Sequence, residues 1–79
     1  MRLLRWLRLV RWGVNKKDAL RIAQATCEQL GYPWSEPVEV FHHFGNWRVW
    51  TNANKRGGNV RVIVDGDSGE VRSTWFGRR

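Results

Sequence analysis

Residues 59–74 constrain the fold more than any other part of the sequence. In this stretch Arg61 and Ile63 separate valines that occupy every second position, and turn-forming Asp, Ser and Gly residues follow before the alternation resumes. A period of two that is interrupted by turn residues predicts two adjacent antiparallel strands with one buried face. The valines that form this face are Val60, Val62, Val64 and Val71. Another element of the chain must pack against this apolar face.

A helix predicted between Asn15 and Gly31 can supply that cover. Asn15 is suited to cap the first turn, where the charge of Asp18 favours the helix dipole, and Gly31 is a natural stop. Between them, small and aliphatic residues share one face at helical spacing. They are Ala19, Ile22, Ala23, Thr26, Cys27 and Leu30. Their small size predicts a close approach of helix to sheet.

Two further strands are predicted before the hairpin. Residues 38–44 and 47–51 alternate, and Gly45-Asn46 is predicted to form the tight turn between them. Residues 32–37 contain two prolines and form a connector, and residues 52–58 form a polar loop. The order predicts an α+β fold, in which one main helix packs on a four-stranded antiparallel meander sheet.

Length and charge bound the organisation of the chain. The 79 residues fit one small domain, predicted for residues 14–79, and the lone Cys27 is interpreted as a core residue. Six of the 14 basic residues, and none of the seven acidic ones, lie in residues 1–17, so this segment carries +6 of the net charge of +7. A nucleic-acid-binding domain usually carries its basic patch on the folded body, which here is almost neutral.

Residues 1–13 form a basic leader, and residues 1–12 of it are predicted to form a short amphipathic helix. Its apolar face consists of Leu3, Trp6, Leu7 and Val10, and the arginines Arg2, Arg5, Arg8 and Arg11 lie around the opposite side. The uncharged runs are too short for a signal peptide or a transmembrane helix, which favours the cytoplasm or the inner surface of a membrane. Such a segment can dock on its own sheet or on a partner, lie on an anionic membrane surface, or remain a disordered tail.

Three segments together resemble the PepSY domain, a family of small helix-on-sheet modules. They are Asp-Ala-Leu-Arg-Ile-Ala at 18–23, Trp-Arg-Val-Trp-Thr at 47–51, and Val-Arg-Val-Ile-Val-Asp-Gly-Asp-Ser-Gly-Glu-Val at 60–71. The resemblance covers about residues 15–75. PepSY domains occur in propeptides of secreted metallopeptidases and in bacterial envelope proteins, where a role in binding or restraining peptidases has been proposed. The resemblance implies that the turn containing Asp65, Ser68 and Gly69 is a structural signature.

The sheet face opposite the helix is the predicted binding surface. Alternation places guanidinium and aromatic groups there, in a mixture suited to an acidic peptide or to nucleic-acid bases. The predicted partner-binding residues are Arg48, Trp50, Arg61, Ile63 and Arg72, and the same alternation extends to Thr74. A second interpretation, slightly favoured because it would bury Trp50 and Ile63, is that the apolar face of the leader covers this side of the sheet and makes a three-layer sandwich. The predicted function is a non-catalytic protein-binding module, with a peptidase as one partner class; the alternatives are membrane-surface association through residues 1–12 and, least favoured, single-stranded nucleic-acid binding.

Neither catalysis nor a cofactor is predicted. Serines lie in no nucleophile-elbow setting, and adjacent His42 and His43 point to opposite faces of a strand, so they are poorly placed to share a metal. Asp65, Asp67 and Glu70 bring three carboxylates into one turn without the twelve-residue frame of an EF-hand. Because aspartates favour turns by accepting hydrogen bonds from nearby backbone, turn formation is the preferred interpretation.

Overall fold

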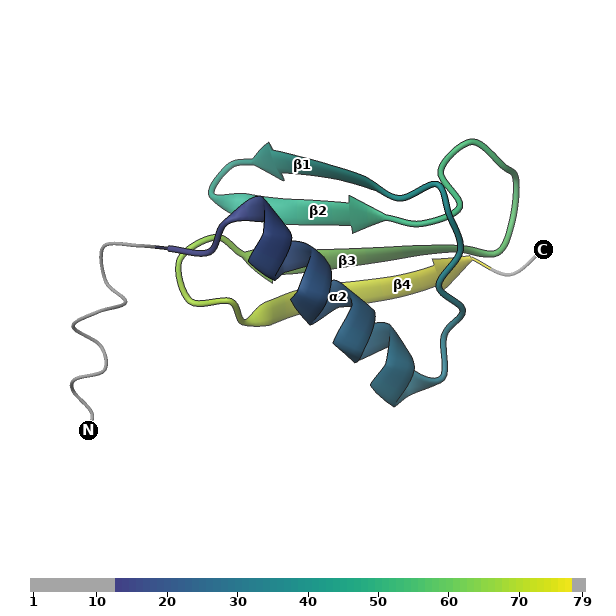
Figure 1. The fold of residues 1–79 in the computed structure, drawn as a ribbon, viewed down its shortest axis with the longest axis horizontal. Helices are drawn as coiled ribbons and strands as arrows, with labels where there is room; N and C mark the ends of the chain where they lie inside the picture. Colours follow the sequence, from purple (N-terminus) through teal and green to yellow (C-terminus); the bar gives the residue numbers. More distant parts are fainter. Residues whose placement is uncertain (1–12, 78–79) are drawn as a thin grey trace.

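The fold is a helix lying across a four-stranded sheet. The computed structural model describes residues 13–77, so the helix predicted for residues 1–12 lies outside the described part. Helix α2 (Lys16–Leu30) is followed by β1 (Glu39–His43), β2 (Asn46–Trp50), β3 (Asn59–Asp65) and β4 (Val71–Gly77). The strands pair antiparallel in the order β1-β2-β3-β4 (Figure 1). The predicted α+β meander is therefore confirmed.

Helix α2 begins and ends where the sequence predicts. The side chain of Asn15 accepts a hydrogen bond of 2.8 Å from the backbone N–H of Asp18. At the other end Gly31 adopts the left-handed conformation with φ of 74°, and the N–H of Tyr32 donates to the carbonyl of Cys27 at 2.9 Å. These contacts satisfy backbone groups that have no partner within the helix. Within residues 13–77, no helix is long and apolar enough to cross a membrane.

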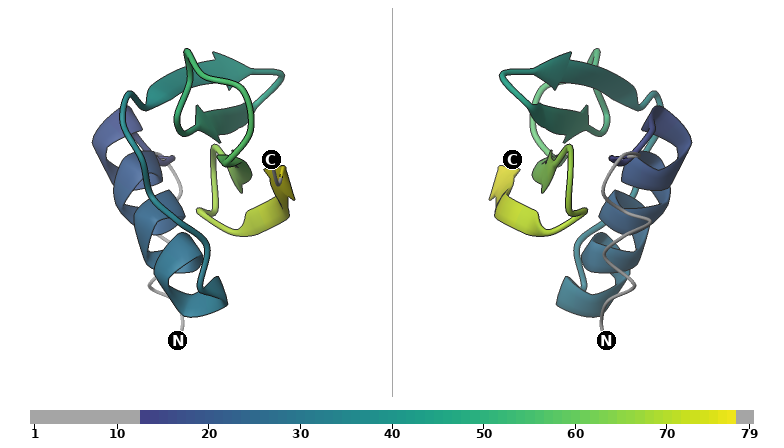
Figure 2. Two further views of the ribbon diagram at one scale, coloured as in Figure 1. Left: turned by 90° about the vertical axis from the view of Figure 1, so that its right-hand side faces the viewer. Right: turned by 90° about the vertical axis from the view of Figure 1, so that its left-hand side faces the viewer.

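The core lies between α2 and one face of the sheet. Ala19, Ala23 and Cys27 are buried on the helix, and small side chains there let the backbone come close to the strands. The strands contribute the fully buried Val49, Val60, Val62 and Val64. Figure 2 shows α2 on one side of the sheet only. Burial raises the pKa of the Cys27 thiol, which keeps it in the unreactive protonated form.

A β-bulge changes the alternation in the last strand. Ile63 pairs with Ser73, but its neighbour Val64 pairs with Val71, so Arg72 is an extra residue. Beyond the bulge Thr74 pairs with the buried Val62 and faces α2. The prediction that Thr74 lies on the outer face is therefore wrong, because an inserted residue reverses the face of every residue that follows it.

Two predicted boundaries also shift. The tight turn of the first hairpin has Phe44 and Gly45 at its centre, and Asn46 is already the first residue of β2. The last strand continues past Thr74 to Gly77. Only the second shift lengthens a strand, by three residues; β1 is shorter than predicted, since it ends at His43 and leaves Phe44 in the turn, and β2 keeps its predicted length.

Three segments meet at the backbone of Gly66. Its carbonyl accepts a hydrogen bond of 2.6 Å from the N–H of Val14, and its own N–H donates to the carbonyl of Gly45 at 2.8 Å. The indole Nε1 of Trp47 donates to the carbonyl of Val14 at 2.7 Å. A Cβ on Gly66 would overlap the carbonyl of Gly45, so only glycine allows this approach. The contact holds the start of the described chain against both hairpin turns.

Asn59 fixes the loop between β2 and β3 from inside. The side chain is 8% exposed, and its Nδ2 donates to the carbonyls of Thr51 (3.1 Å), Asn52 (2.7 Å) and Lys55 (3.3 Å). Buried carbonyls without a donor are costly, so this one amide stabilises a whole polar loop.

We expect Asn59→Ala to lower the free energy of unfolding by about 1–3 kcal/mol, because it removes the donor to the carbonyls of Thr51 and Lys55 and leaves that of Asn52 with only the N–H of Lys55. Asn59→Asp should cost more, since it places a carboxylate oxygen against three carbonyl oxygens. Urea denaturation of the two variants measures both effects. Asn54→Ala is the control in the same loop, where Asn54 is exposed, and a change as large as that of Asn59→Ala would contradict the role given to Asn59.

Candidate functional site

The sheet face opposite α2 carries no helix in the part of the chain that the structure describes, and we call it the open face. It consists of residues at every second position of the four strands, together with the bulge residue of β4. These are Glu39, Phe41 and His43 of β1, Asn46, Arg48 and Trp50 of β2, Arg61, Ile63 and Asp65 of β3, and Arg72, Ser73 and Trp75 of β4.

One cross-strand row of the open face combines two indoles with a guanidinium. Arg61 on β3 pairs with Trp50 on one side and with Trp75 on the other. Its guanidinium carbon lies 4.6 Å from the centroid of the Trp50 ring and 5.3 Å from that of Trp75. The two rings are inclined by only 19°, with centroids 6.2 Å apart. Both indoles thus attract the same cation through their ring faces.

The two indole rings position the guanidinium of Arg61 without using its N–H donors. It donates no hydrogen bond to any of residues 13–77, so the donors of its planar fork remain available. Trp75 is 49% exposed, and its ring lies over the Cα of Gly77, in the space that a side chain there would fill. The row therefore presents a positioned cation beside exposed aromatic area.

The neighbouring row is mixed in character. Phe41, Arg48 and Ile63 follow one another across β1, β2 and β3. Phe41 is half exposed, and a shallow hollow is lined by Phe41, His42, His43 and Arg48. All five predicted partner-binding residues thus lie on one face, but the structure adds Phe41 and Trp75 to them. Trp75 escaped the sequence reasoning because the bulge that turns it outward has no clear sequence signal.

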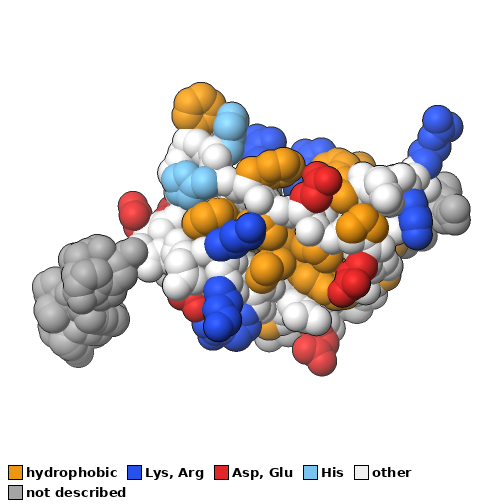
Figure 3. All heavy atoms as spheres, turned by 45° about the horizontal axis from the view of Figure 1, so that its top comes forward, with side chains coloured by type: hydrophobic (Ala, Val, Ile, Leu, Met, Phe, Trp, Pro, Cys, Tyr) orange, Lys and Arg blue, Asp and Glu red, His pale blue; other side chains and the backbone are white. Residues whose placement is uncertain are grey.

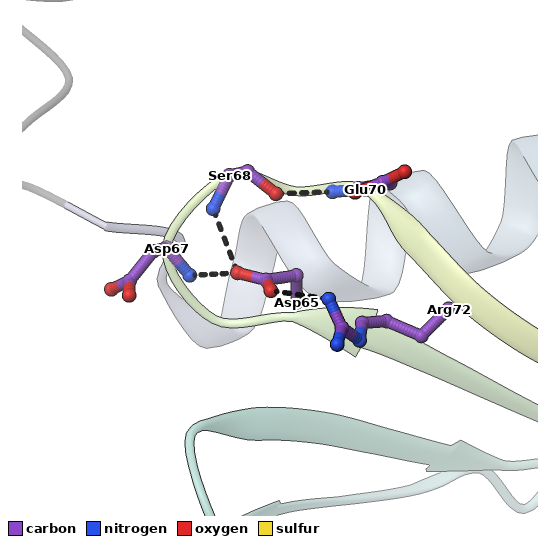
Figure 4. Close-up of polar contacts among 5 residues, drawn as sticks. All are labelled: Asp65, Asp67, Ser68, Glu70 and Arg72. Carbon is purple, nitrogen blue, oxygen red and sulfur yellow. Dashed lines mark hydrogen bonds and ion pairs between the residues drawn. The ribbon is translucent and has the colours of Figure 1, made fainter.

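Among the three arginines of the open face, Arg72 differs from Arg48 and Arg61 because it forms an ion pair with Asp65. Its guanidinium lies 3.1 Å from Oδ2 of Asp65, and Oδ1 of Asp65 accepts hydrogen bonds from the N–H groups of Asp67 (2.8 Å) and Ser68 (3.0 Å) (Figure 4). The amide of Ser68, followed by that of Asp67, lowers the pKa of Asp65, and the charge of Arg72 contributes less. Asp65 therefore stabilises the turn through two backbone hydrogen bonds and forms an ion pair with Arg72.

The two adjacent histidines of β1 point to opposite faces of the sheet. His42 packs edge-on against Trp47 with ring centroids 4.9 Å apart on the α2 side, whereas His43 lies on the open face. Within residues 13–77 no group of three or more His, Cys, Asp or Glu side chains could hold a metal ion. The absence of catalysis stays a prediction.

Comparisons with known proteins give no relative for this chain. No protein-family model matches it, and no curated protein or solved structure matches either. The resemblance to the PepSY domain therefore rests on the quoted motifs and stays a prediction, as does the division into a leader of residues 1–13 and a domain of residues 14–79.

The residues predicted to contact a membrane or to dock on a protein are not placed by the structure. They belong to residues 1–12, outside the described part of the chain. They are Leu3, Trp6, Leu7, Val10, Arg2, Arg5 and Arg8.

The lowered pKa of Asp65 predicts a specific dependence of stability on pH. An unfolded Asp has a pKa of about 3.9, so the stabilisation from Asp65 is complete above that value and is lost as pH falls through the lower folded value. We expect Asp65→Asn, which keeps the turn acceptor, to be less stable than the wild type at pH 7 and to lose less stability below about pH 4. Thermal unfolding between pH 7 and pH 2 measures this.

Arg72→Met provides the matched comparison. Because the backbone amides outweigh Arg72 as the cause of the shift, this variant should keep most of the acid dependence that Asp65→Asn loses. Parallel curves for the wild type and Asp65→Asn would contradict the assignment.

Proposed function

We propose that this protein is a non-catalytic binding module whose open face takes an acidic segment of a partner protein. The observation that supports this most is the guanidinium of Arg61, which two indole rings orient and which donates no hydrogen bond within the described residues. A planar fork of this kind suits a carboxylate, which can accept two parallel hydrogen bonds from it. Trp50 and Trp75 offer apolar area for the residues that flank the carboxylate.

The charges of the open face support an acidic partner. Asp65 is paired with Arg72, so Arg48 and Arg61 face solvent with Glu39 as the remaining acidic residue of this face. None of residues 13–77 forms a salt bridge with Arg48 or Arg61. Partly desolvated aromatic and arginine side chains are also the types that contribute most to affinity at protein interfaces.

The same charges argue against the leader as the occupant of this face. Residues 1–12 contain four arginines and no acidic residue, so docking them beside Arg48 and Arg61 would bring like charges together. Nucleic acid remains a competitor that the experiment must distinguish, since indoles also stack on bases. We favour a protein, because the folded body outside the leader is almost neutral.

The proposal predicts that Trp50→Ala combined with Arg61→Ala weakens binding to an acidic peptide by at least about tenfold, because hydrogen bonds to charged groups contribute roughly 1.5–3 kcal/mol. The probes are fluorescent peptides that contain Glu, Leu and Trp, and matched peptides with Gln in place of Glu. Fluorescence anisotropy with the full chain gives both affinities.

Arg21→Ala is the control, because Arg21 is an exposed arginine on α2 that is paired with Asp18. It should bind the acidic peptide as the wild type does. Equal affinity for the Glu and Gln peptides, or tighter binding of oligothymidine than of either peptide, would contradict the proposal.

Peptidases are the first natural partners to test, in view of the PepSY resemblance. The wild type, added to a secreted zinc metallopeptidase that lacks its propeptide, should slow cleavage of casein, and the double variant should not. Full peptidase activity with either protein would exclude this partner class while leaving the peptide result to decide on the face itself.

A further inference from the structure

A hollow lies between the C-terminal half of α2 and the connector that follows this helix. It has a volume of about 290 Å³ and is lined by Gln24, Glu28, Tyr32 and Trp34. We call it the connector hollow. Figure 3 shows acidic and hydrophobic side chains next to one another in the right-hand half of the molecule, the half in which α2 ends (Figure 1). None of the residues that line this hollow belongs to the open face.

The fold holds both aromatic side chains of the connector hollow in place. The ring of Tyr32 packs against that of Phe76, with centroids 5.1 Å apart. Next to Trp34, the carbonyl of Ser35 accepts a hydrogen bond of 2.7 Å from the N–H of Asn52, which ties the connector to the β2–β3 loop. Tyr32 and Trp34 also pack against the core, so the hollow is already formed without a ligand.

The electrostatics of the connector hollow favour a cation. Gln24 and Glu28 lie one turn apart on the same face of α2, so an amide and a carboxylate border the hollow together. Glu28 belongs to the last turn of α2, where the helix dipole is negative and a basic side chain would be favourable. That turn contains no basic residue, and none of residues 13–77 forms an ion pair with Glu28. The described residues therefore leave this negative charge unpaired.

The aromatic side chains narrow the class of cation. The faces of Trp and Tyr rings attract cations, and they do so most effectively when the cation carries apolar groups that can lie against the rings, as a methylated ammonium does. A primary ammonium is more strongly hydrated and loses more on leaving water. The volume of the connector hollow is at the lower end of the range for ligand sites, which suits a small head group.

We propose that the connector hollow binds a methylated ammonium group, with Tyr32 and Trp34 against its methyl groups and the carboxylate of Glu28 as its counter-charge. This group occurs in small ions such as choline and in the side chain of trimethyl-lysine in proteins. The site requires neither the open face nor the function proposed for that face.

The test uses the full isotope-labelled chain and follows the indole N–H signal of Trp34 by NMR, with Trp34→Phe to assign that signal. Choline should shift it in a saturable way. The neutral analogue of choline, with carbon in place of the nitrogen, should bind at least about fivefold more weakly, because it lacks the cation–π and ion-pair contributions. A peptide that contains one trimethyl-lysine is the second probe. Whichever of choline and the peptide binds more tightly identifies the source of the ammonium group.

Glu28→Gln should weaken choline binding by about threefold or more, because it removes the counter-charge. It should not lower the melting temperature, since a carboxylate in the last turn is unfavourable for α2, and misfolding would then not explain a loss of binding. Glu70→Gln is the matched control, because Glu70 is an exposed glutamate between β3 and β4, and it should bind as the wild type does.

Three results would overturn the proposal. The first is that neither choline nor the trimethyl-lysine peptide shifts the Trp34 signal. The second is that the neutral analogue binds as tightly as choline. The third is that Glu28→Gln binds choline as tightly as Glu70→Gln does.

Discussion

The contact of Gly66 with two other backbones is the constraint on which one end of the described fold depends. Gly66 accepts a hydrogen bond from Val14 and donates one to Gly45, so the segment before α2 is held against both hairpin turns. Because the contact is between backbones, it needs glycine and little else, and it leaves the adjacent side chains free to vary.

One face of β3 packs into the core, and the other belongs to the open face proposed to bind a partner. Val60, Val62 and Val64 point into the core, and Arg61 and Ile63 necessarily point the other way, because successive side chains of a strand alternate. A short chain buries little area and needs every one of these valines. The open face is therefore positioned by the most buried strand of the protein, which holds Arg61 rigidly between its aromatic neighbours.

Sequence reasoning predicted most of the fold, because capping residues and alternation act locally. Asn15 and Gly31 define α2 through contacts within a few residues, and strict alternation assigned both faces of β3. The bulge at Arg72 was not predictable, since it results from how β4 fits against β3, and the missed Trp75 follows from it. Phe44 was missed for a related reason. A phenylalanine in a left-handed turn contradicts local preference, so the alternation of residues 38–44 assigned it to the strand instead.

The open-face row of Trp50, Arg61 and Trp75 lies at the end of β2 that is away from the β1–β2 turn. Trp50 is the last residue of that strand, whereas Phe44 precedes its first residue. The extended chain of β2, from Asn46 to Trp50, spans about 13 Å between the turn and this row. A peptide bound to this row would therefore leave the exposed Phe44 at the turn uncovered.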